Sequence, residues 1–339
     1  MLITKYDVIA MGNAIVDMTF TIKKELLKNL KLQCGSMPLI NQEEKDFFLK
    51  ELKDSKLANP HSCSFGGSAA NTLHHLAVMG FRCALIGTVS DDEEGKAYLD
   101  DLKKTGIDFI GKIASEKDYV TSSGVCIVLV DEDGERTMLT YLGCASFFDQ
   151  ESILQQTSSC RIFYLEGYAI SNKKNWSLIK KFLKQQKDCL LSFSASDASC
   201  INSFPKIFKK ITKNFDLCFT NAIEAKSLLR NTDENQPVEK LLSKFYNKKR
   251  IFVVTDGPKG SFLIREQHLH IPAHPTKVVD TTGAGDAYAA GIIGSLLKKE
   301  SFKKKNEKVV NWPEDHQLLI MGNVASKLAS GVISHHGSR

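Results

Sequence analysis

The stretch Asp280–Gly291, DTTGAGDAYAAG, combines a glycine turn with the start of a helix. Gly283 and Gly285 allow a tight turn with no side chain in the way, and helical spacing continues over Ala287–Leu297. The free N–H groups of a helix N-terminus attract anions, so this turn suits the negative charge on a transferring phosphoryl group. Asp286 lies in the first helical turn, where a carboxylate can take a proton from an attacking hydroxyl. The stretch therefore predicts a phosphoryl-transfer site; a glycine turn with Asp286 as a helix N-terminal charge is the alternative interpretation.

Around this stretch, short apolar runs alternate with lysine-bearing helical segments along most of the 339 residues. Such alternation predicts an α/β fold, a mainly parallel sheet flanked by helices on both faces. We expect one domain over residues 1–339. The predicted strands are 7–11, 83–87, 161–165, 189–193, 217–220 and 251–255, and the predicted helices are 69–79, 94–104, 174–186, 207–214, 238–247 and 287–297.

Residues 14–41 and 116–144 break the alternation, because they contain strand-like runs and turns without intervening helices. In the second segment, Gly124–Val130 and Arg136–Leu142 flank the turn DEDG at 131–134, which predicts a hairpin. The two segments can meet as a small β-sheet over one edge of the α/β body. We expect this sheet to act as a lid rather than as an independent domain.

Composition excludes several classes of protein. The chain is 42% hydrophobic and 25% charged, which is ordinary for a globular protein that needs no disulfides or structural metal. Its net charge of +6 comes from lysines in short clusters, which indicates solvated surfaces rather than a nucleic-acid-binding face. The nine cysteines contain no C-x-x-C pair, which favours a reducing, cytoplasmic location. No apolar run reaches the ~20 residues of a membrane span, and no signal peptide is expected.

The segment CSFGGSAAN at 63–71 is suited to close approach of a hydroxylated ligand. Gly66 and Gly67 leave room for a ligand beside the backbone, and the Asn71 amide can both donate to and accept from sugar hydroxyls. A plain turn before a helix is the alternative interpretation of the glycine pair.

Two further segments place polar side chains just after predicted strands. In GNAIVD at 12–17, the Asp17 carboxylate can accept hydrogen bonds from a vicinal diol, although a surface or capping aspartate is the alternative. In NAIE at 221–224, Asn221 and Glu224 share one face of a helix start. They can serve as oxygen ligands or water-holders for Mg²⁺, or form a capping box.

These four segments, in this order, resemble those of the ribokinase-like family of carbohydrate kinases, also called the PfkB family. The similarity covers about residues 6–338, and GGSAANTL departs from the family pattern at Leu73, where a small residue is usual. GNAIVDM, FGGSAAN, GERTMLTYLG, YLEGY and FTNAIEA are most similar to the adenosine kinase branch. The resemblance implies a ribokinase-like fold and ATP-dependent phosphorylation of a nucleoside 5′-hydroxyl, with adenosine giving AMP in purine salvage.

The resemblance also implies roles for matching residues. It implies a catalytic group of Asp286 as the base, the backbone of Gly283, Ala284 and Gly285, and Arg136 reaching the phosphates from the lid. It implies a substrate-binding group of Asn13, Asp17, Gly66, Gly67, Ser68, Asn71 and Tyr168. It implies an ATP groove of Asn221, Thr255, Gly257, Gly260 and Asn323, Mg²⁺ held through water by Asn221 and Glu224, and K⁺ near Asp280 and Thr282.

Three functions remain open: a nucleoside kinase, a sugar kinase of the same family acting on ribose or fructose, and a non-enzymatic member that binds a nucleoside. Intact catalytic motifs disfavour the third, and neither G-x-G-x-x-G after the first strand nor a P-loop is present. The first two differ at the pocket wall opposite the ribose, where a nucleobase needs apolar surface. The candidate residues of this wall are Met37, Leu39, Leu139, Tyr141, Tyr164 and Tyr168.

We expect small-molecule partners, no binding to nucleic acid or membrane, and a monomer or homodimer.

Overall fold

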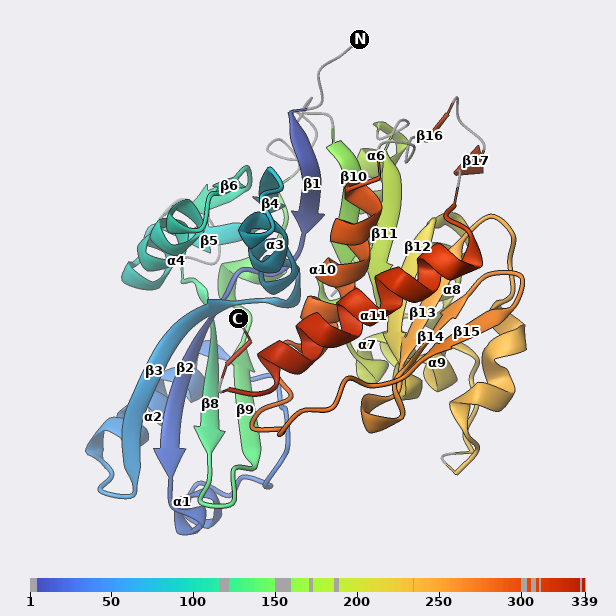
Figure 1. Ribbon diagram of the computed structural model, residues 1–339. Coiled ribbons are helices and arrows are strands. Elements are labelled where there is room, and N and C mark those ends of the chain that lie inside the picture. The colour runs from blue at the N-terminus through green and yellow to red at the C-terminus, as the bar shows by residue number, and fades with distance from the viewer. Residues whose placement is uncertain are drawn as a thin grey trace.

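A nine-stranded sheet forms the body of the protein in a computed structural model (Figure 1). The structure describes residues 5–115, 122–149, 160–170, 173–185, 189–233, 235–299, 304–305, 309–310, 312–335 and 337–338. The sheet runs in the order β15 (His268–Ile271), β14 (Ser261–Ile264), β13 (Ile251–Thr255), β12 (Leu217–Asn221), β11 (Leu190–Ser194), β10 (Cys160–Glu166), β1 (Tyr6–Met11), β4 (Cys83–Ile86) and β6 (Ile107–Phe109). Neighbours from β13 to β6 pair in parallel, and β14 and β15 extend the sheet as an antiparallel hairpin.

Helices cover both faces of this sheet. Its strands carry apolar side chains on both faces, and each face packs against helices in a core of its own. Val8 and Ala10 of β1 belong to one core, and Ile9 and Met11 belong to the other. The first core includes residues of α3 (Ser68–Val78), α4 (Glu93–Lys104), α10 (Ala284–Leu297) and α11 (Asp315–Val332). The second includes residues of α6 (Lys173–Gln185), α7 (Ala198–Ser203), α8 (Pro205–Asn214), α9 (Ala222–Leu228) and η3 (Val238–Phe245).

This arrangement confirms the predicted mainly parallel sheet with helices on both faces. The segment predicted as an α-helix over 238–247 is instead the 3₁₀ helix η3, and Gln186 of the predicted helix 174–186 lies outside the described residues. Among the described residues, none of the helices has both the length and the apolar character to cross a membrane. The short elements are β5 (Thr88–Ser90), β7 (Lys112–Ala114), β16 (Lys304–Lys305), β17 (Val309–Val310), η1 (Gly143–Ser146), η2 (Gly167–Ala169) and η4 (Gly257–Lys259).

A second sheet projects from one end of the body (Figure 1). Its order is β3 (Ala58–Gly66), β2 (Ile15–Ile22), β8 (Gly124–Val130) and β9 (Arg136–Tyr141). β8 and β9 pair in antiparallel fashion from Val125 with Tyr141 to Val130 with Arg136, which confirms the predicted hairpin. β3 was not predicted. Residues 116–121 of the predicted second segment lie outside the described residues.

Two helices cover the outer face of this second sheet, which corrects the expectation that residues 14–41 contain none. α1 (Lys24–Asn29) lies inside that segment, and α2 (Gln42–Asp54) follows it. The second sheet therefore has a hydrophobic core of its own, because side chains of both helices pack on its strands. That core is formed by Phe20, Ile22, Leu26, Leu27, Phe48, Leu52, Ala58, Val125, Ile127, Leu129 and Leu139.

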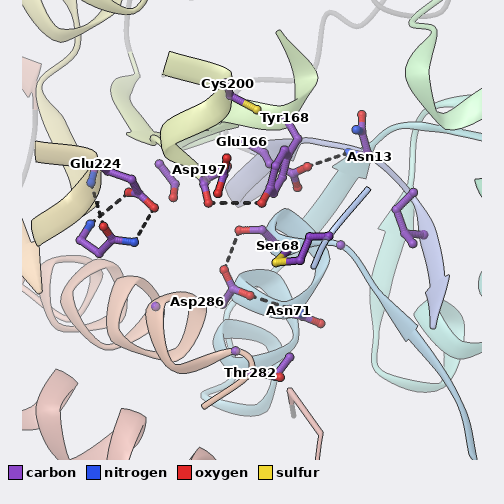
Figure 2. A pocket seen from close by; sticks show the side chains of 18 of the residues that line it. Asn13, Ser68, Asn71, Glu166, Tyr168, Asp197, Cys200, Glu224, Thr282 and Asp286 are labelled. Atoms are coloured by element: carbon purple, nitrogen blue, oxygen red, sulfur yellow. Dashed lines mark hydrogen bonds between the residues drawn. The ribbon is translucent and has the colours of Figure 1, made fainter. Parts of the chain in front are cut away.

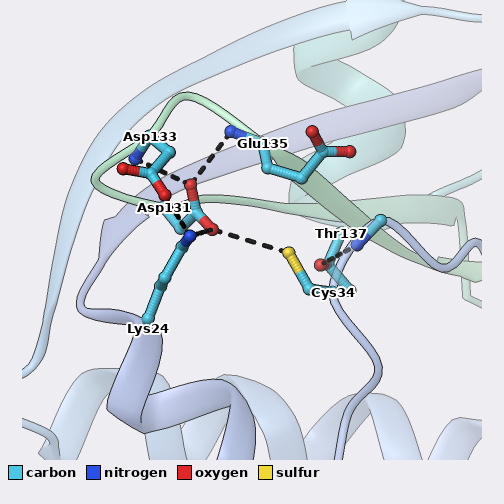
Figure 3. A network of polar contacts seen from close by, with 7 residues as sticks. Lys24, Cys34, Asp131, Asp133, Glu135 and Thr137 are labelled. Carbon is cyan, nitrogen blue, oxygen red and sulfur yellow. Dashed lines mark hydrogen bonds and ion pairs between the residues drawn. The ribbon is translucent and has the colours of Figure 1, made fainter.

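One buried carboxylate joins three parts of the second sheet at its far end (Figure 3). Oδ1 of Asp131 accepts hydrogen bonds from the backbone N–H groups of Asp133 and Glu135, each at 2.9 Å. Oδ2 of Asp131 lies 3.5 Å from the Cys34 thiol and 3.7 Å from the Lys24 ammonium group. Asp131 thus connects the hairpin turn, the start of α1 and the loop that follows α1.

Candidate active site

A cavity of about 860 Å³ lies between the two sheets, at the carboxyl ends of the parallel strands. β1 has β10 on one side and β4 on the other, and ligands of open α/β sheets bind where the strand order changes direction in this way. The loops after neighbouring strands supply its walls, with Asn13 after β1, Tyr168 after β10 and Asp197 after β11 (Figure 2). Asn221, at the end of β12, also lines the cavity.

The predicted glycine turn forms one wall of the cavity through Gly283, Ala284 and Gly285. Gly283 caps α10 with φ +77°, a left-handed conformation that favours glycine, and a Cβ atom there would lie 2.6 Å from the Ser338 carbonyl oxygen. At Gly285 a Cβ atom would meet no atom within 4 Å apart from its chain neighbours and the adjoining backbone of its own helix. The helix N-terminus is therefore open to a ligand at Gly285.

Asp286 lies in the first turn of α10 and faces the N-terminal part of α3 (Figure 2). Its Oδ1 accepts a hydrogen bond from the Ser68 hydroxyl at 2.6 Å, and its Oδ2 accepts one from the Asn71 amide nitrogen at 3.2 Å. All three side chains line the cavity. The structure thus brings together two segments more than 200 residues apart that the sequence had marked as candidates.

Arg136 reaches from β9 of the second sheet to the start of the glycine turn. Its guanidinium donates to Asp280 at 2.5 Å and to the Thr282 hydroxyl at 3.0 Å. Asp280 also accepts from the backbone N–H groups of Thr282 and Gly337. A guanidinium neutralises the Asp280 carboxylate in this structure, and the K⁺ site near Asp280 and Thr282 stays a prediction.

Asp17 enters the cavity from β2. A Cβ atom at Gly66 would lie 2.4 Å from its carboxylate, so glycine at position 66 makes room for that group. Gly67 has φ +90°, and a Cβ atom there would lie 2.2 Å from the Asn13 carbonyl oxygen. Gly66 itself does not line the cavity, whereas Asn13, Asp17 and Gly67 do.

Asn221 and Glu224 form the capping box that the sequence offered as one interpretation. The Asn221 side chain accepts from the Glu224 N–H at 2.8 Å, and Glu224 accepts from the Asn221 N–H at 3.0 Å. Both also line the cavity. Burial, with the charges of Asp197 and Asp286, raises the pKa of Glu224 to about 7. The donor set therefore suits a cation, since a positive charge in the cavity would relieve this repulsion.

Glu166 was missed by sequence analysis. It ends the buried strand β10, and its carboxyl accepts from the backbone N–H groups of Ala69 at 2.7 Å and Asn13 at 3.3 Å. It therefore joins the start of α3 to the end of β1 beneath the cavity. Burial raises the pKa of Glu166 to about 8. A charged residue closing the apolar run RIFYL was the available signal.

This buried carboxyl makes stability depend on pH. The folded-state pKa of Glu166, about 8, exceeds its ordinary value of 4.5. Its stabilising contribution is thus complete below about pH 4.5 and is lost as pH rises through 8. We expect the free energy of unfolding to fall between pH 5 and 8, by about 1.4 kcal/mol per unit of pKa difference.

Urea unfolding at pH 5, 6.5 and 8 measures this slope. Glu166→Gln should flatten it, whereas Glu239→Gln, at an exposed position in η3, should leave it unchanged. Equal slopes for the Glu166 variant and the unmodified chain would contradict the assignment.

The apolar wall of the cavity differs from the predicted one. Met37 and Leu39 line it while remaining 58% and 70% exposed, so a ligand can cover them, and Tyr168 also lines it. Leu139, Tyr141 and Tyr164 do not line the cavity: Leu139 belongs to the core under α1 and α2, Tyr164 is buried in the body, and the Tyr141 hydroxyl lies 2.8 Å from that of Ser122. The remaining apolar or weakly polar lining residues include Ile15, Cys126, Met138, Thr140, Leu142, Ile170, Cys200 and Phe204.

The predicted ATP groove is only partly continuous with this cavity. Thr255 and Asn221 line it, but Gly257, Gly260 and Asn323 do not. Asn323 is exposed on α11, where its amide donates to the Leu319 carbonyl. In the described part of the chain, no group of three or more His, Cys, Asp or Glu side chains is arranged to hold a metal ion.

The model of the pfkB family of carbohydrate kinases matches residues 36–339. The match spans far more than half of the chain, which belongs to this family and is a kinase. The resemblance inferred from the four sequence segments is thereby confirmed.

Relatives within the family differ in their substrates. A probable fructokinase-5 of Arabidopsis thaliana is 27% identical over 246 residues, covering 70% of this chain and 74% of that protein. The adenosine kinase of Sinorhizobium meliloti has a TM-score of 0.78 at 27% identity, covering 99% of this chain and 96% of that one. A probable sugar kinase from Rhizobium etli has a TM-score of 0.80 at 24% identity, with the same coverage. The ribokinase-like fold is confirmed, and both substrate classes are represented.

Proposed function

We propose that the chain transfers the γ-phosphoryl group of ATP to the 5′-hydroxyl of a nucleoside, adenosine in particular, giving AMP for purine salvage. The observation that carries the proposal is that Asp286 and the open turn at Gly285 share one cavity with the Asp17 carboxylate and with exposed apolar side chains. A carboxylate at that place can accept hydrogen bonds from a vicinal diol. Apolar surface opposite the hydroxyl-binding groups fits a nucleobase better than a free sugar.

In the proposed reaction, the 5′-hydroxyl oxygen of the nucleoside attacks the γ-phosphorus of ATP, and ADP leaves. The Asp286 carboxylate takes the proton of that hydroxyl during the attack. Ser68 and Asn71 orient that carboxylate through the hydrogen bonds they donate to it. The backbone N–H groups at Gly283, Ala284 and Gly285 stabilise the charge on the transferring group. Asp17, Gly67, Asn71 and Asn13 hold the ribose, and Tyr168 contacts the base.

The second sheet acts as a lid in this proposal. As the lid closes, Arg136 leaves its ion pair with Asp280 and contacts the phosphates of ATP. ATP enters as its Mg²⁺ complex, and Asn221 and Glu224 hold the water molecules of that ion. Thr255 lies beside the nucleotide, and Gly257, Gly260 and Asn323 form the outer groove. We also propose a reducing, cytoplasmic location, because all nine cysteines are free.

A panel of acceptors tests the substrate class. We expect ATP-dependent phosphorylation of adenosine with a kcat/KM at least 10-fold above those of inosine, guanosine, ribose and fructose, and no turnover without Mg²⁺. Thin-layer separation of labelled products, with ADP release as a second readout, measures it. If ribose or fructose is the best acceptor, the chain is a sugar kinase, the alternative that the fructokinase relative favours.

A further inference from the structure

Five carboxyl groups line the cavity, and none of the described residues that line it is Lys, Arg or His. Arg136, a cation on the second sheet, is paired with Asp280, and neither residue lines the cavity. ATP brings Mg²⁺ with it, but an acceptor brings no cation of its own. Mg²⁺ offsets part of the charge of ATP, whereas a negative charge on an acceptor would be uncompensated in this cavity. The five groups are Asp17, Glu166, Asp197, Glu224 and Asp286.

The proposed reaction leaves two of these carboxyls without a role, Glu166 and Asp197. Glu166 has a structural one, because it joins the start of α3 to the end of β1. The Asp197 side chain makes no such connection between distant elements within the described part of the chain. It precedes α7, and its Oδ1 accepts from the Ser199 N–H at 2.6 Å. Capping alone does not explain its place, because many helix caps lie far from any cavity and Asp197 lines this one. Its negative charge contributes to raising the pKa values of Tyr168 and Glu224, which both line the cavity.

A strained turn holds Asp197 in this position. Ser196 has φ +67°, and the Asp197 N–H donates to the Ala195 carbonyl at 2.8 Å across it, which makes a γ-turn of the rare, strained kind. The Ser196 hydroxyl accepts from the Gly167 N–H at 2.9 Å, and the Ser196 carbonyl accepts from the Tyr168 hydroxyl at 3.3 Å. Strain of this kind persists where surrounding contacts fix it, commonly at ligand sites.

We propose that Asp197 is a specificity-determining residue. It restricts the acceptor to molecules that carry no negative charge on the part bound beside Asp197 and Tyr168. The inference rests on the proposed function only in taking this cavity as the acceptor site. A carboxylate or phosphate on the acceptor would meet Asp197 at short range in a partly desolvated site. Charge repulsion of this kind is a common means of rejecting unwanted ligands. Neutral nucleosides and sugars fit, and phosphorylated or acidic ones do not.

The test uses two pairs of acceptors of equal size that differ in charge. One pair is N6-carboxymethyladenosine and its amide, and the other is gluconate and gluconamide. Calorimetry at pH 7.5 gives the dissociation constant of each compound. Where a pair binds, we expect the dissociation constant of the neutral member to be at least 10-fold lower than that of the charged member.

Asp197→Asn removes the charge and keeps a residue that caps helices equally well. We expect it to reduce the ratio within a pair to about 3-fold or less. The matched control is Asp92→Asn, at the N-cap of α4 and outside the cavity, which should preserve the ratio. A general loss of affinity in a variant would change both dissociation constants of a pair alike, so their ratio would stay the same.

Equal affinity for the charged and neutral members in the unmodified protein would overturn the proposal, as would an unchanged ratio in Asp197→Asn. Binding of neither pair at millimolar concentration would also overturn it, because the cavity would then not be an acceptor site. If only the sugar pair binds, the nucleoside kinase assignment fails, while the ratio for that pair still decides the role of Asp197.

Discussion

Replacing Asp286 by Asn is expected to lower kcat by roughly 10²–10⁴-fold while the protein remains folded, because general-base catalysis contributes a factor of that size. Asparagine has nearly the same shape and can still accept the hydrogen bond that Ser68 donates to Asp286. It cannot take a proton from the attacking hydroxyl. KM should change little, because the loss falls on the transition state.

Steady-state kinetics with ATP and adenosine, together with a melting temperature for each variant, measure this effect. The matched control is Asp315→Asn, which makes the same change in the first turn of α11, outside the cavity, and should retain full activity. A kcat for Asp286→Asn within a few-fold of the unmodified enzyme would remove Asp286 from the role of base.

The second large effect concerns Asp17 and the ribose diol. Asp17→Ala is expected to lower kcat/KM for adenosine by about 10- to 100-fold, because hydrogen bonds to a charged group contribute roughly 1.5–3 kcal/mol each. The unmodified enzyme should use 2′-deoxyadenosine far less well than adenosine, since the missing hydroxyl leaves part of the carboxylate unpaired. Asp17→Ala should lose most of that discrimination.

The comparison needs kcat/KM for both nucleosides in three proteins: the unmodified chain, Asp17→Ala, and Asp133→Ala at the far turn of the same sheet. Asp133 lies outside the cavity and pairs with Lys24, so its removal should leave the preference intact. Equal use of both nucleosides by the unmodified enzyme would contradict the diol role of Asp17.

Many of the residues that line the cavity could be predicted, because they follow the glycine turns and strand ends directly. Gly67 and Gly283 occupy positive-φ positions, and their local sequence carries that requirement. Hydrogen bonds between residues far apart in the sequence leave no such local signal. Glu166 holds backbone N–H groups about 97 and 153 residues away, and only the folded sheet brings them together.

The wrong choice of wall residues on β9 has a physical cause. Strand alternation reveals the ligand face only when the opposite face is polar, but Leu139 on the opposite face packs in the core beneath α1 and α2. Because those helices were not predicted, the more apolar face of β9, with Leu139 and Tyr141, was assigned to the cavity instead of the face with Met138 and Thr140. The capping box at Asn41 and Glu44 was the sequence signal for α2.

The separate hydrophobic core of the second sheet makes that sheet a single mechanical unit. Asp17 on β2 and Arg136 on β9 are fixed to one another by the ladders through β8, so neither can move without the other. In the proposed function, a nucleoside bound at Asp17 would change the free energy of placing Arg136 at the phosphates. By thermodynamic linkage, ATP would then change the affinity for the nucleoside by the same factor. The sheet would thus couple two binding sites that share no residue.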